Sequence, residues 1–132
     1  MPPIPASLLL CCGLVSAANG AQADITVRVA CVGDSITFGA GVEPRERSCY
    51  PALLGHLLGE GYEVRNFGVS GATVLSHGDL PYIDQPACRQ AREWQPHMVV
   101  IMLGTNDTKP HNWERRGAFV DDYTDLVESF QA

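Results

Sequence analysis

Residues 25–35 read Ile-Thr-Val-Arg-Val-Ala-Cys-Val-Gly-Asp-Ser, and this stretch decides the fold class. Its first eight residues, up to Val32, are mostly β-branched or apolar and alternate little, which is typical of a strand buried on both faces. Gly33 ends the strand, and Asp34 and Ser35 enter the loop that follows. Such a strand predicts a parallel sheet with helices on both of its faces.

The rest of the chain alternates between helix and strand patterns. We expect a helix over 48–58, with Ser48 as its cap and Pro51 in its first turn. Its apolar stripe consists of Leu53, Leu54, Leu57 and Leu58. The other expected elements are strands over 62–67 and 97–103, helices over 86–94 and 113–130, and loops over 68–85 and 104–112.

The last expected helix, over 113–130, is amphipathic. Its apolar face carries Phe119, Tyr123, Leu126, Val127 and Phe130, and its acidic face carries Asp121, Asp122, Asp125 and Glu128. Strands separated by helices imply right-handed crossovers and a parallel sheet. We expect the strands in the order second, first, third, with the third as an open edge that is apolar on both faces.

Composition bounds the class of protein. The chain has 132 residues, enough for one domain, and a net charge of −6. An acidic chain without a basic cluster is a poor nucleic-acid binder, because phosphate neutralisation needs Lys or Arg on one face. No apolar run reaches the roughly 20 residues that span a bilayer, so we expect no stable membrane span.

Residues 1–23 have the pattern of a signal peptide and contain no Lys, Arg, Asp or Glu. An apolar core over 6–18 is followed by Ala21-Gln22-Ala23, the small-x-small pattern that signal peptidase cleaves. The alternative is a disordered or buried N-terminal tail. Cleavage near Ala23 predicts export to the periplasm or the extracellular space, leaving 24–132 as the folded part.

Export would leave three cysteines, which allow one disulfide and one free thiol. We predict a disulfide between Cys49 and Cys88, because both start helices at the same edge of the sheet, and a reduced Cys31 within its strand. The alternative is three unpaired thiols. No Cys or His cluster has the spacing of zinc ligands, so no metal site is expected.

Polar and glycine-rich motifs follow each predicted strand, at the edge where parallel sheets form their sites. They are Gly33-Asp34-Ser35, Asn66-Phe67-Gly68 and Gly104-Thr105-Asn106-Asp107. Ser35 is a candidate nucleophile for acyl transfer if a base activates it. The Gly68 N–H and the Asn106 side-chain amide are candidate donors to an oxyanion. Together they predict half of an ester-hydrolysis site.

Each motif has a simpler interpretation when taken alone. Gly-Asp-Ser is common in turns, Gly68 suits a turn after a strand, and residues 104–107 suit a loop that caps a helix. Ser70 lies in Gly-Val-Ser-Gly-Ala, which misses the last glycine of a nucleophile elbow, so we interpret it as a loop residue. Gly39-Ala-Gly41 lacks the third glycine of a dinucleotide turn. The shared order and edge of the three motifs favour the catalytic interpretation.

At these residues the sequence resembles the SGNH/GDSL hydrolase family. Residues 33–37 (Gly-Asp-Ser-Ile-Thr) look like its first block, Gly68 like its second and residues 104–107 like its third, and the resemblance covers residues 26–132. The sequence around Gly68 and Asn106 looks most like that of family members that act as carbohydrate O-acetylesterases, including sialate esterase-like ones.

The resemblance implies a flavodoxin-like three-layer α/β/α fold, of which this chain holds the N-terminal part with about three strands. It implies Ser35 as the nucleophile, with the Ser35 N–H, the Gly68 N–H and Asn106 as the oxyanion hole. Asp34 would orient the loop, and Gly33, Gly104 and Asp107 would support the site. The substrate would be a small ester or an acetylated carbohydrate, and no metal or organic cofactor is implied.

The family takes its histidine base from an Asp-x-x-His motif, and this chain has none. We expect His56 on a solvent-facing helix surface and His97 at the end of the sheet remote from Ser35. His77 and His111 are loop residues. Two hypotheses follow: a serine esterase of which these residues are the N-terminal part, or a non-catalytic product that at most binds glycans or esters weakly.

Overall fold

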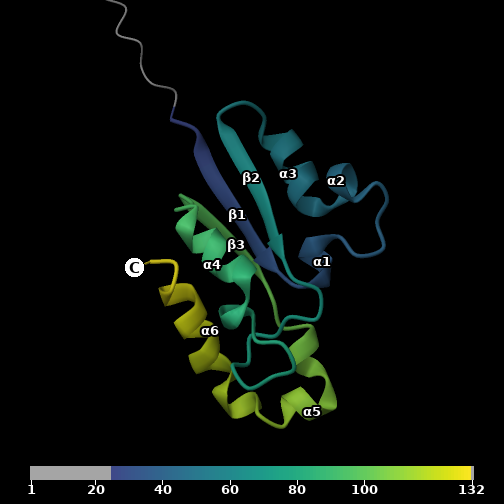
Figure 1. The fold of residues 1–132 in the computed structure, drawn as a ribbon, viewed down its shortest axis with the longest axis vertical. Helices are drawn as coiled ribbons and strands as arrows, with labels where there is room; N and C mark the ends of the chain where they lie inside the picture. The colour runs from purple at the N-terminus through teal and green to yellow at the C-terminus, as the bar shows by residue number, and fades with distance from the viewer. Residues whose placement is uncertain (1–24, 132) are drawn as a thin grey trace, which may run out of the picture.

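Three parallel strands form one sheet in the computed structural model, which describes residues 25–131. The strands are β1 (Val27–Gly33), β2 (Tyr62–Gly68) and β3 (Met98–Met102). Their spatial order is β2-β1-β3, with β1 in the centre, which confirms the predicted order (Figure 1). β1 is buried from Val29 onward, as its nearly continuous apolar sequence predicts.

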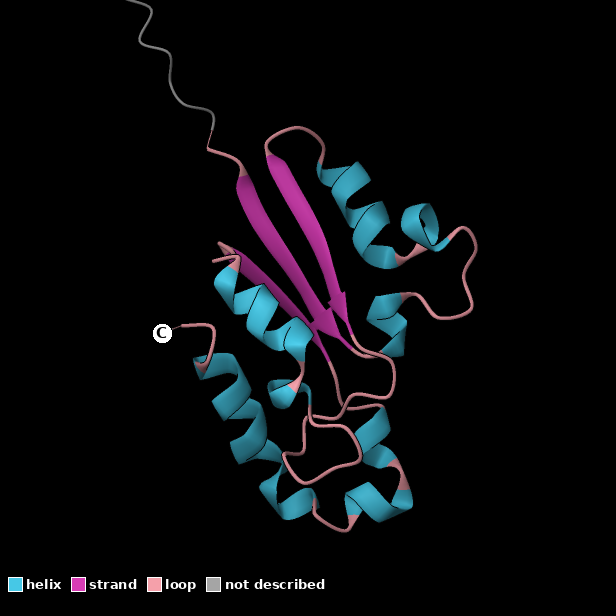
Figure 2. Cartoon of the chain, viewed as in Figure 1, coloured by secondary structure: helices cyan, strands magenta, loops and turns pink. Residues whose placement is uncertain are grey.

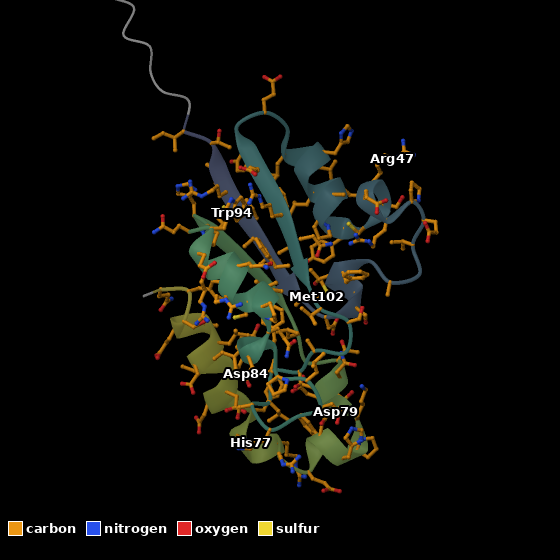
Figure 3. The ribbon with its side chains drawn as sticks, in the orientation of Figure 1. Arg47, His77, Asp79, Asp84, Trp94 and Met102 are labelled. Atoms are coloured by element: carbon orange, nitrogen blue, oxygen red, sulfur yellow. The ribbon has the colours of Figure 1, made fainter. Side chains whose placement is uncertain are left out.

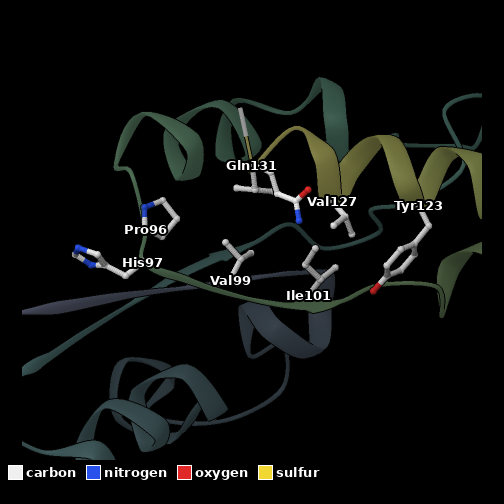
Figure 4. Close-up of a pocket in the computed structure, with 8 residues that line it drawn as sticks. Pro96, His97, Val99, Ile101, Tyr123, Val127 and Gln131 are labelled. Atoms are coloured by element: carbon white, nitrogen blue, oxygen red, sulfur yellow. The ribbon is translucent and has the colours of Figure 1, made fainter.

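Helices cover both faces of the sheet, as the α/β prediction requires. The helices are α1 (Ser35–Phe38), α2 (Arg45–Ser48), α3 (Tyr50–Leu58), α4 (Pro86–Glu93), α5 (Pro110–Trp113) and α6 (Phe119–Glu128). Short 3-10 turns are η1 (Tyr82–Asp84), η2 (Asn106–Thr108) and η3 (Arg116–Ala118). Helices α1 to α3 pack on one face of the sheet, next to β2, whereas α4 and α6 cover the other face (Figures 2 and 4).

The main core lies between the sheet and the α4–α6 layer. Its fully buried members are Val32, Ala72, Tyr82, Cys88, Ala91 and Leu126. The Tyr82 hydroxyl reaches through this core and donates to the Phe67 carbonyl at 2.7 Å, so that the loop after β2 is tied to the strand. This packing places the long 69–85 segment directly against the carboxyl end of the sheet.

The predicted helix over 48–58 is wrong at its start. The chain forms two helices, α2 and α3, and Cys49 lies between them in an extended conformation. Pro51 stands in the first turn of α3 as predicted, but Ser48 does not cap it, because its hydroxyl donates to the Glu43 carbonyl. The predicted apolar stripe is also not buried as a unit, since Leu57 is 81% exposed.

The predicted helix over 113–130 starts later, at Phe119. Trp113 ends α5 instead, and the turn η3 separates the two helices. The expected loop over 104–112 therefore contains η2 and α5. The two faces predicted for the last helix are confirmed, because Leu126 is buried with four half-buried neighbours, whereas three of the four acidic residues are exposed.

The strand β3 forms an open edge, as predicted. Val99 and Ile101 face α6, whereas Met98, Val100 and Met102 point to the other face and are 36–53% exposed. Alternate residues of a strand point to opposite faces, so both surfaces of this edge are apolar. The edge itself carries no charged side chain over 98–102.

The predicted Cys49–Cys88 disulfide is wrong. The three cysteines within the described residues are free and buried. Cys88 belongs to the core beneath α4, whereas Cys49 lies at the start of α3, where the Asn66 amide approaches its sulfur at 3.6 Å. Helices α3 and α4 cover opposite faces of the sheet, so the two thiols are separated by the sheet. Residues 1–23 lie outside the described residues.

Candidate active site

The three strands end at the same level, which brings the three motifs to one edge. Gly33 is the register partner of Gly68 in β2 and of Met102 in β3. The pairing continues one step beyond the strands, because the Val69 N–H donates to the Gly33 carbonyl at 2.9 Å. The segments that carry Ser35, Gly68 and Asn106 therefore start from one line across the sheet, as the sequence predicts.

Ser35 is the first residue of α1, and not a loop residue as predicted. Asp34 caps this helix: its Oδ1 accepts the Ile36 N–H at 2.9 Å, and the side chain is almost fully buried. An aspartate at this position satisfies a backbone donor that the first turn of a helix leaves unpaired. Ser35 itself is half-buried, so its hydroxyl stands at the rim of the protein surface.

Gly33 has a steric role. A Cβ on this residue would overlap the Thr37 hydroxyl and come within 2.6 Å of the Met102 carbonyl oxygen. Only glycine lets α1 turn back so closely over the sheet. A side chain at position 33 would therefore disturb the start of α1.

Two groups that lie near Thr37 of α1, the Tyr50 hydroxyl and the Cys31 thiol, are neutral. The Thr37 and Tyr50 hydroxyls lie 3.2 Å apart, and burial raises the pKa of Tyr50 to about 12. Burial likewise raises the pKa of the Cys31 thiol. Both groups stay protonated at neutral pH, so neither can serve there as a base for Ser35.

Gly68 ends β2 directly under the backbone of α1. A Cβ at this position would clash with the Phe38 nitrogen and lie 2.7 Å from its Cα. The Gly68 N–H donates to Asn66 Oδ1 at 2.9 Å, while Asn66 Nδ2 donates to the Thr37 carbonyl at 2.7 Å. Asn66 thus joins β2 to α1, and the candidate oxyanion donor already has a partner.

Asn106 opens the turn η2 and is half-buried. Its Nδ2 donates to the Ala72 carbonyl at 3.0 Å. A side-chain amide carries two hydrogens, so a second donor remains for an oxyanion. Gly104, two residues earlier, has φ 123°, and a Cβ there would meet the Phe119 ring at 3.6 Å.

Asp107 holds the loop that follows β2. Its buried carboxylate accepts the Val74 N–H at 3.0 Å and the Leu75 N–H at 2.8 Å. Carboxylates that accept backbone N–H groups make strong, charge-assisted bonds. Asp107 therefore has a structural function in holding this loop.

None of the four histidines hydrogen-bonds to Ser35 within the described residues. His56 is exposed on α3, as expected. His97 precedes β3, and its Nδ1 accepts the Arg28 N–H at 2.9 Å at the amino end of the sheet, as predicted. His77 lies beside Ser76, and His111 Nε2 lies 2.7 Å from Asp79 Oδ2.

The sequence analysis gave no role to two asparagines of this region. Asn66 belongs to the predicted motif Asn66-Phe67-Gly68, but only Gly68 was expected to act there. Asn112 is buried in α5 and bonds to both Asn106 and Asp79. A lone asparagine after Pro110 carries no pattern that would predict such contacts.

A groove of about 490 Å³ lies away from these motifs, between β3 and α6 (Figure 4). It is lined by Pro96, His97, Val99, Ile101, Tyr123, Val127, Phe130 and Gln131. None of the residues predicted for catalysis borders it. The groove follows from the open edge of β3 and is not part of the candidate site.

The part of the chain that the structure describes contains no cluster of three His, Cys, Asp or Glu residues that could hold a metal ion. No helix between residues 25 and 131 combines the length and the apolar character needed to cross a membrane.

Relatives of known structure share this architecture. The chain is 26% identical to a protein from Agrobacterium tumefaciens assigned as an arylesterase, with a TM-score of 0.59. It is 27% identical to a carbohydrate acetylesterase family member from Sinorhizobium meliloti, with a TM-score of 0.55. Each match covers 77% of this chain and 53% or 54% of the other chain.

A curated relative is more similar in sequence. The chain is 46% identical over 105 residues to an acetylxylan esterase of Xylanibacter ruminicola. This match covers 80% of the chain but only 22% of the relative, so the chain spans about a fifth of that protein's length. The family model of the GDSL-like lipase/acylhydrolases matches residues 31–132. The sequence resemblance is thereby confirmed: the chain belongs to the GDSL-like lipase/acylhydrolase family.

Proposed function

We propose that these residues form the nucleophile and oxyanion half of a serine esterase that hydrolyses small carboxylic esters, acetyl esters of carbohydrates in particular. The observation that carries the proposal is the common register of Gly33, Gly68 and Met102, which aligns the three motifs at one edge. The acetyl and carbohydrate parts rest on the relatives, one an acetylxylan esterase and another a carbohydrate acetylesterase family member.

In the proposed reaction, Ser35 Oγ attacks the ester carbonyl and passes its proton to a base. The tetrahedral intermediate then expels the alcohol, which takes up that proton, and leaves an acyl group on Ser35. Water attacks the acyl-enzyme in the same way, releases the carboxylic acid and restores the serine.

Three donors would stabilise the oxyanion: the Ser35 N–H, the Gly68 N–H and the Asn106 amide. The Ser35 N–H suits the role because the first N–H groups of a helix lack partners within it. The Gly68 N–H would share its hydrogen between Asn66 Oδ1 and the oxyanion. Fixed donors of this kind contribute about 10²–10³ in kcat each.

The base in this proposal is none of the four histidines of the chain. The family resemblance assigns that role to a histidine of an Asp-x-x-His motif, which residues 1–132 lack. The proposal therefore places the base elsewhere in a longer protein. It also retains residues 1–23 as a signal peptide and the protein as exported.

A second candidate is a non-catalytic protein that binds acetylated glycans or esters weakly. Two observations favour it: no histidine hydrogen-bonds to Ser35 within the described residues, and the Gly68 N–H is bonded to Asn66. A binder of this kind would keep the half-site and show no turnover.

The two candidates are separated by kinetics on the full-length protein with p-nitrophenyl acetate and acetylated xylan. Under the esterase proposal, Ser35→Ala abolishes turnover and Asn106→Ala lowers kcat by about 10²–10³. Ser70→Ala is the matched control, because Ser70 is an exposed loop residue two positions beyond Gly68. Thermal melting is recorded for each variant, since Asn106→Ala also removes the donor to Ala72. Turnover that is unchanged by Ser35→Ala, or absent altogether, would rule out the esterase proposal.

A further inference from the structure

Asn112 is a buried asparagine whose side-chain amide bonds at both ends. It lies in α5 and is 1% exposed. Its Nδ2 donates to the Asn106 carbonyl at 2.9 Å, and its Oδ1 accepts the Asp79 N–H at 3.0 Å. One side chain thus connects the turn that carries Asn106 with the loop that follows β2.

Asn106 is held from two sides. Its own side chain donates to the Ala72 carbonyl, and its main-chain carbonyl accepts from Asn112. The next residue, Asp107, fixes the same loop two positions further along through Val74 and Leu75. The peptide that carries the Asn106 side chain is therefore anchored on both of its flanks.

The anchor matters because η2 is only three residues long. A 3-10 turn has poorer hydrogen-bond geometry than an α-helix, and the Lys109 N–H reaches the Asn106 carbonyl only at 3.3 Å. The bond from Asn112 to the same oxygen is shorter. It is a second hydrogen bond to the main chain from which the Asn106 side chain extends.

We propose that Asn112 is a positioning residue that aims the Asn106 amide at the oxyanion. Asn112 does not touch the reacting atoms and acts only through Asn106. The inference rests on the proposed function, in which Asn106 is an oxyanion donor.

The second contact of Asn112 allows its two roles to be separated. The Asp79 segment is also held by side chains: His111 Nε2 lies 2.7 Å from Asp79 Oδ2, and Lys109 Nζ lies 3.7 Å from the same atom. Figure 3 shows Asp79 at the α5 end of the molecule. Asn112→Asp keeps an acceptor for the Asp79 N–H but removes the donor to Asn106. Asn112→Ala removes both.

The test measures kcat, KM and melting temperature in the full-length protein with p-nitrophenyl acetate. We expect Asn112→Ala and Asn112→Asp each to lower kcat at least about tenfold with KM little changed, because a misdirected donor loses part of its 10²–10³ contribution. Leu126→Ala is the control, since Leu126 is equally buried in the core but its apolar side chain makes no hydrogen bond to Asn106 or Asp79. It should lower the melting temperature and leave kcat of the folded enzyme unchanged.

A double mutant identifies the route of the effect. If Asn112 acts through Asn106, then Asn112→Ala costs no further kcat in an Asn106→Ala background, because coupled residues are not additive. The inference would be overturned if Asn112→Ala lowered kcat equally in the wild-type and the Asn106→Ala backgrounds. A normal kcat in both Asn112 variants would overturn it as well. Turnover that survives Ser35→Ala would instead overturn the proposed function.

NMR tests the positioning role of Asn112 without relying on enzymatic turnover. In ¹⁵N-labelled full-length protein, the side-chain amide signals of Asn106 are assigned by their loss in Asn106→Ala. Asn112→Asp should shift and broaden them and speed their exchange with water, whereas Leu126→Ala should not. Unchanged Asn106 signals in Asn112→Asp would contradict the positioning role. If Asn112→Ala does not fold, Asn112→Asp still provides both readouts.

Discussion

The Gly68 N–H donates to the Asn66 side-chain oxygen at 2.9 Å, so the strand that supplies a candidate oxyanion donor also supplies its partner. The Asn66 amide group reaches in the other direction, to the Thr37 carbonyl of α1. One asparagine therefore fixes the distance between the end of β2 and the helix that begins with Ser35. The candidate site is therefore a packed assembly of backbone segments and not only a set of three separate residues.

Gly68→Ala should destabilise the protein by about 1–3 kcal/mol, the usual cost of forcing an extra methyl group into a packed site. The new Cβ would clash with Phe38 in α1 and push Ser35 out of line. Chemical denaturation measures the free energy of unfolding. Gly117→Ala is the control, because a Cβ there has nothing within 4 Å, and equal stability of the two variants would contradict the packing argument.

Asp107→Asn should also destabilise the fold, by about 1–3 kcal/mol, because a buried N–H loses its acceptor. The amide has one oxygen to offer where the carboxylate accepts both Val74 and Leu75. Asp125→Asn, at an exposed position on α6, should leave the free energy of unfolding unchanged. A similar result for the two substitutions, again from denaturation curves, would show that Asp107 does not hold the loop.

Cys31, Cys49 and Cys88 should be reduced and slow to react in the native state. Burial raises the pKa of Cys31 and of Cys88, and the thiolate is the reactive form. A thiol-specific reagent, with the modified sites mapped by peptide mass spectrometry, should modify these three cysteines slowly in the folded full-length protein and all three after unfolding without reductant. Modification of Cys31 alone among the three after unfolding would show that Cys49 and Cys88 form a disulfide.

Residues 24–132 expressed alone should be poorly soluble and should show no serine-dependent hydrolysis of p-nitrophenyl acetate. The open edge of β3 exposes Met98, Val100 and Met102, and such edges promote aggregation.

Val100→Lys should raise the soluble fraction of this fragment, whereas Thr124→Lys on the exposed side of α6 should not. Size-exclusion chromatography and the assay check both points. Activity of a soluble monomer that Ser35→Ala removes would place a base within the chain, with His111 and His77 the first to test.

Much of the fold follows from local patterns. The apolar run before Gly33 predicted a strand buried on both faces, and the predicted order of the three strands is confirmed. The boundaries near Cys49 and Trp113 did not follow, because capping and short turns depend on contacts such as Ser48 with Glu43.

The candidate site was predictable only in part. Ser35, Gly68 and Asn106 follow strands, so their common edge could be expected from sequence. The Asn66 side chain bonds to residues 28 and 29 positions away, and the Asn112 side chain bonds to residues 6 and 33 positions away. No local sequence pattern encodes such pairs. The failed disulfide has a similar cause, since the sequence did not show that α3 and α4 lie on opposite faces.

The central claim, that Ser35 carries the acyl group, is tested most directly by trapping the intermediate. The full-length protein is mixed with p-nitrophenyl acetate, quenched in acid within the first turnover and digested for peptide mass spectrometry. We expect one acetyl group on the peptide that contains Ser35. It should accumulate during the burst in the wild-type protein and be absent in Ser35→Ala. An acetyl group on another residue, or turnover in Ser35→Ala at the wild-type rate, would contradict it.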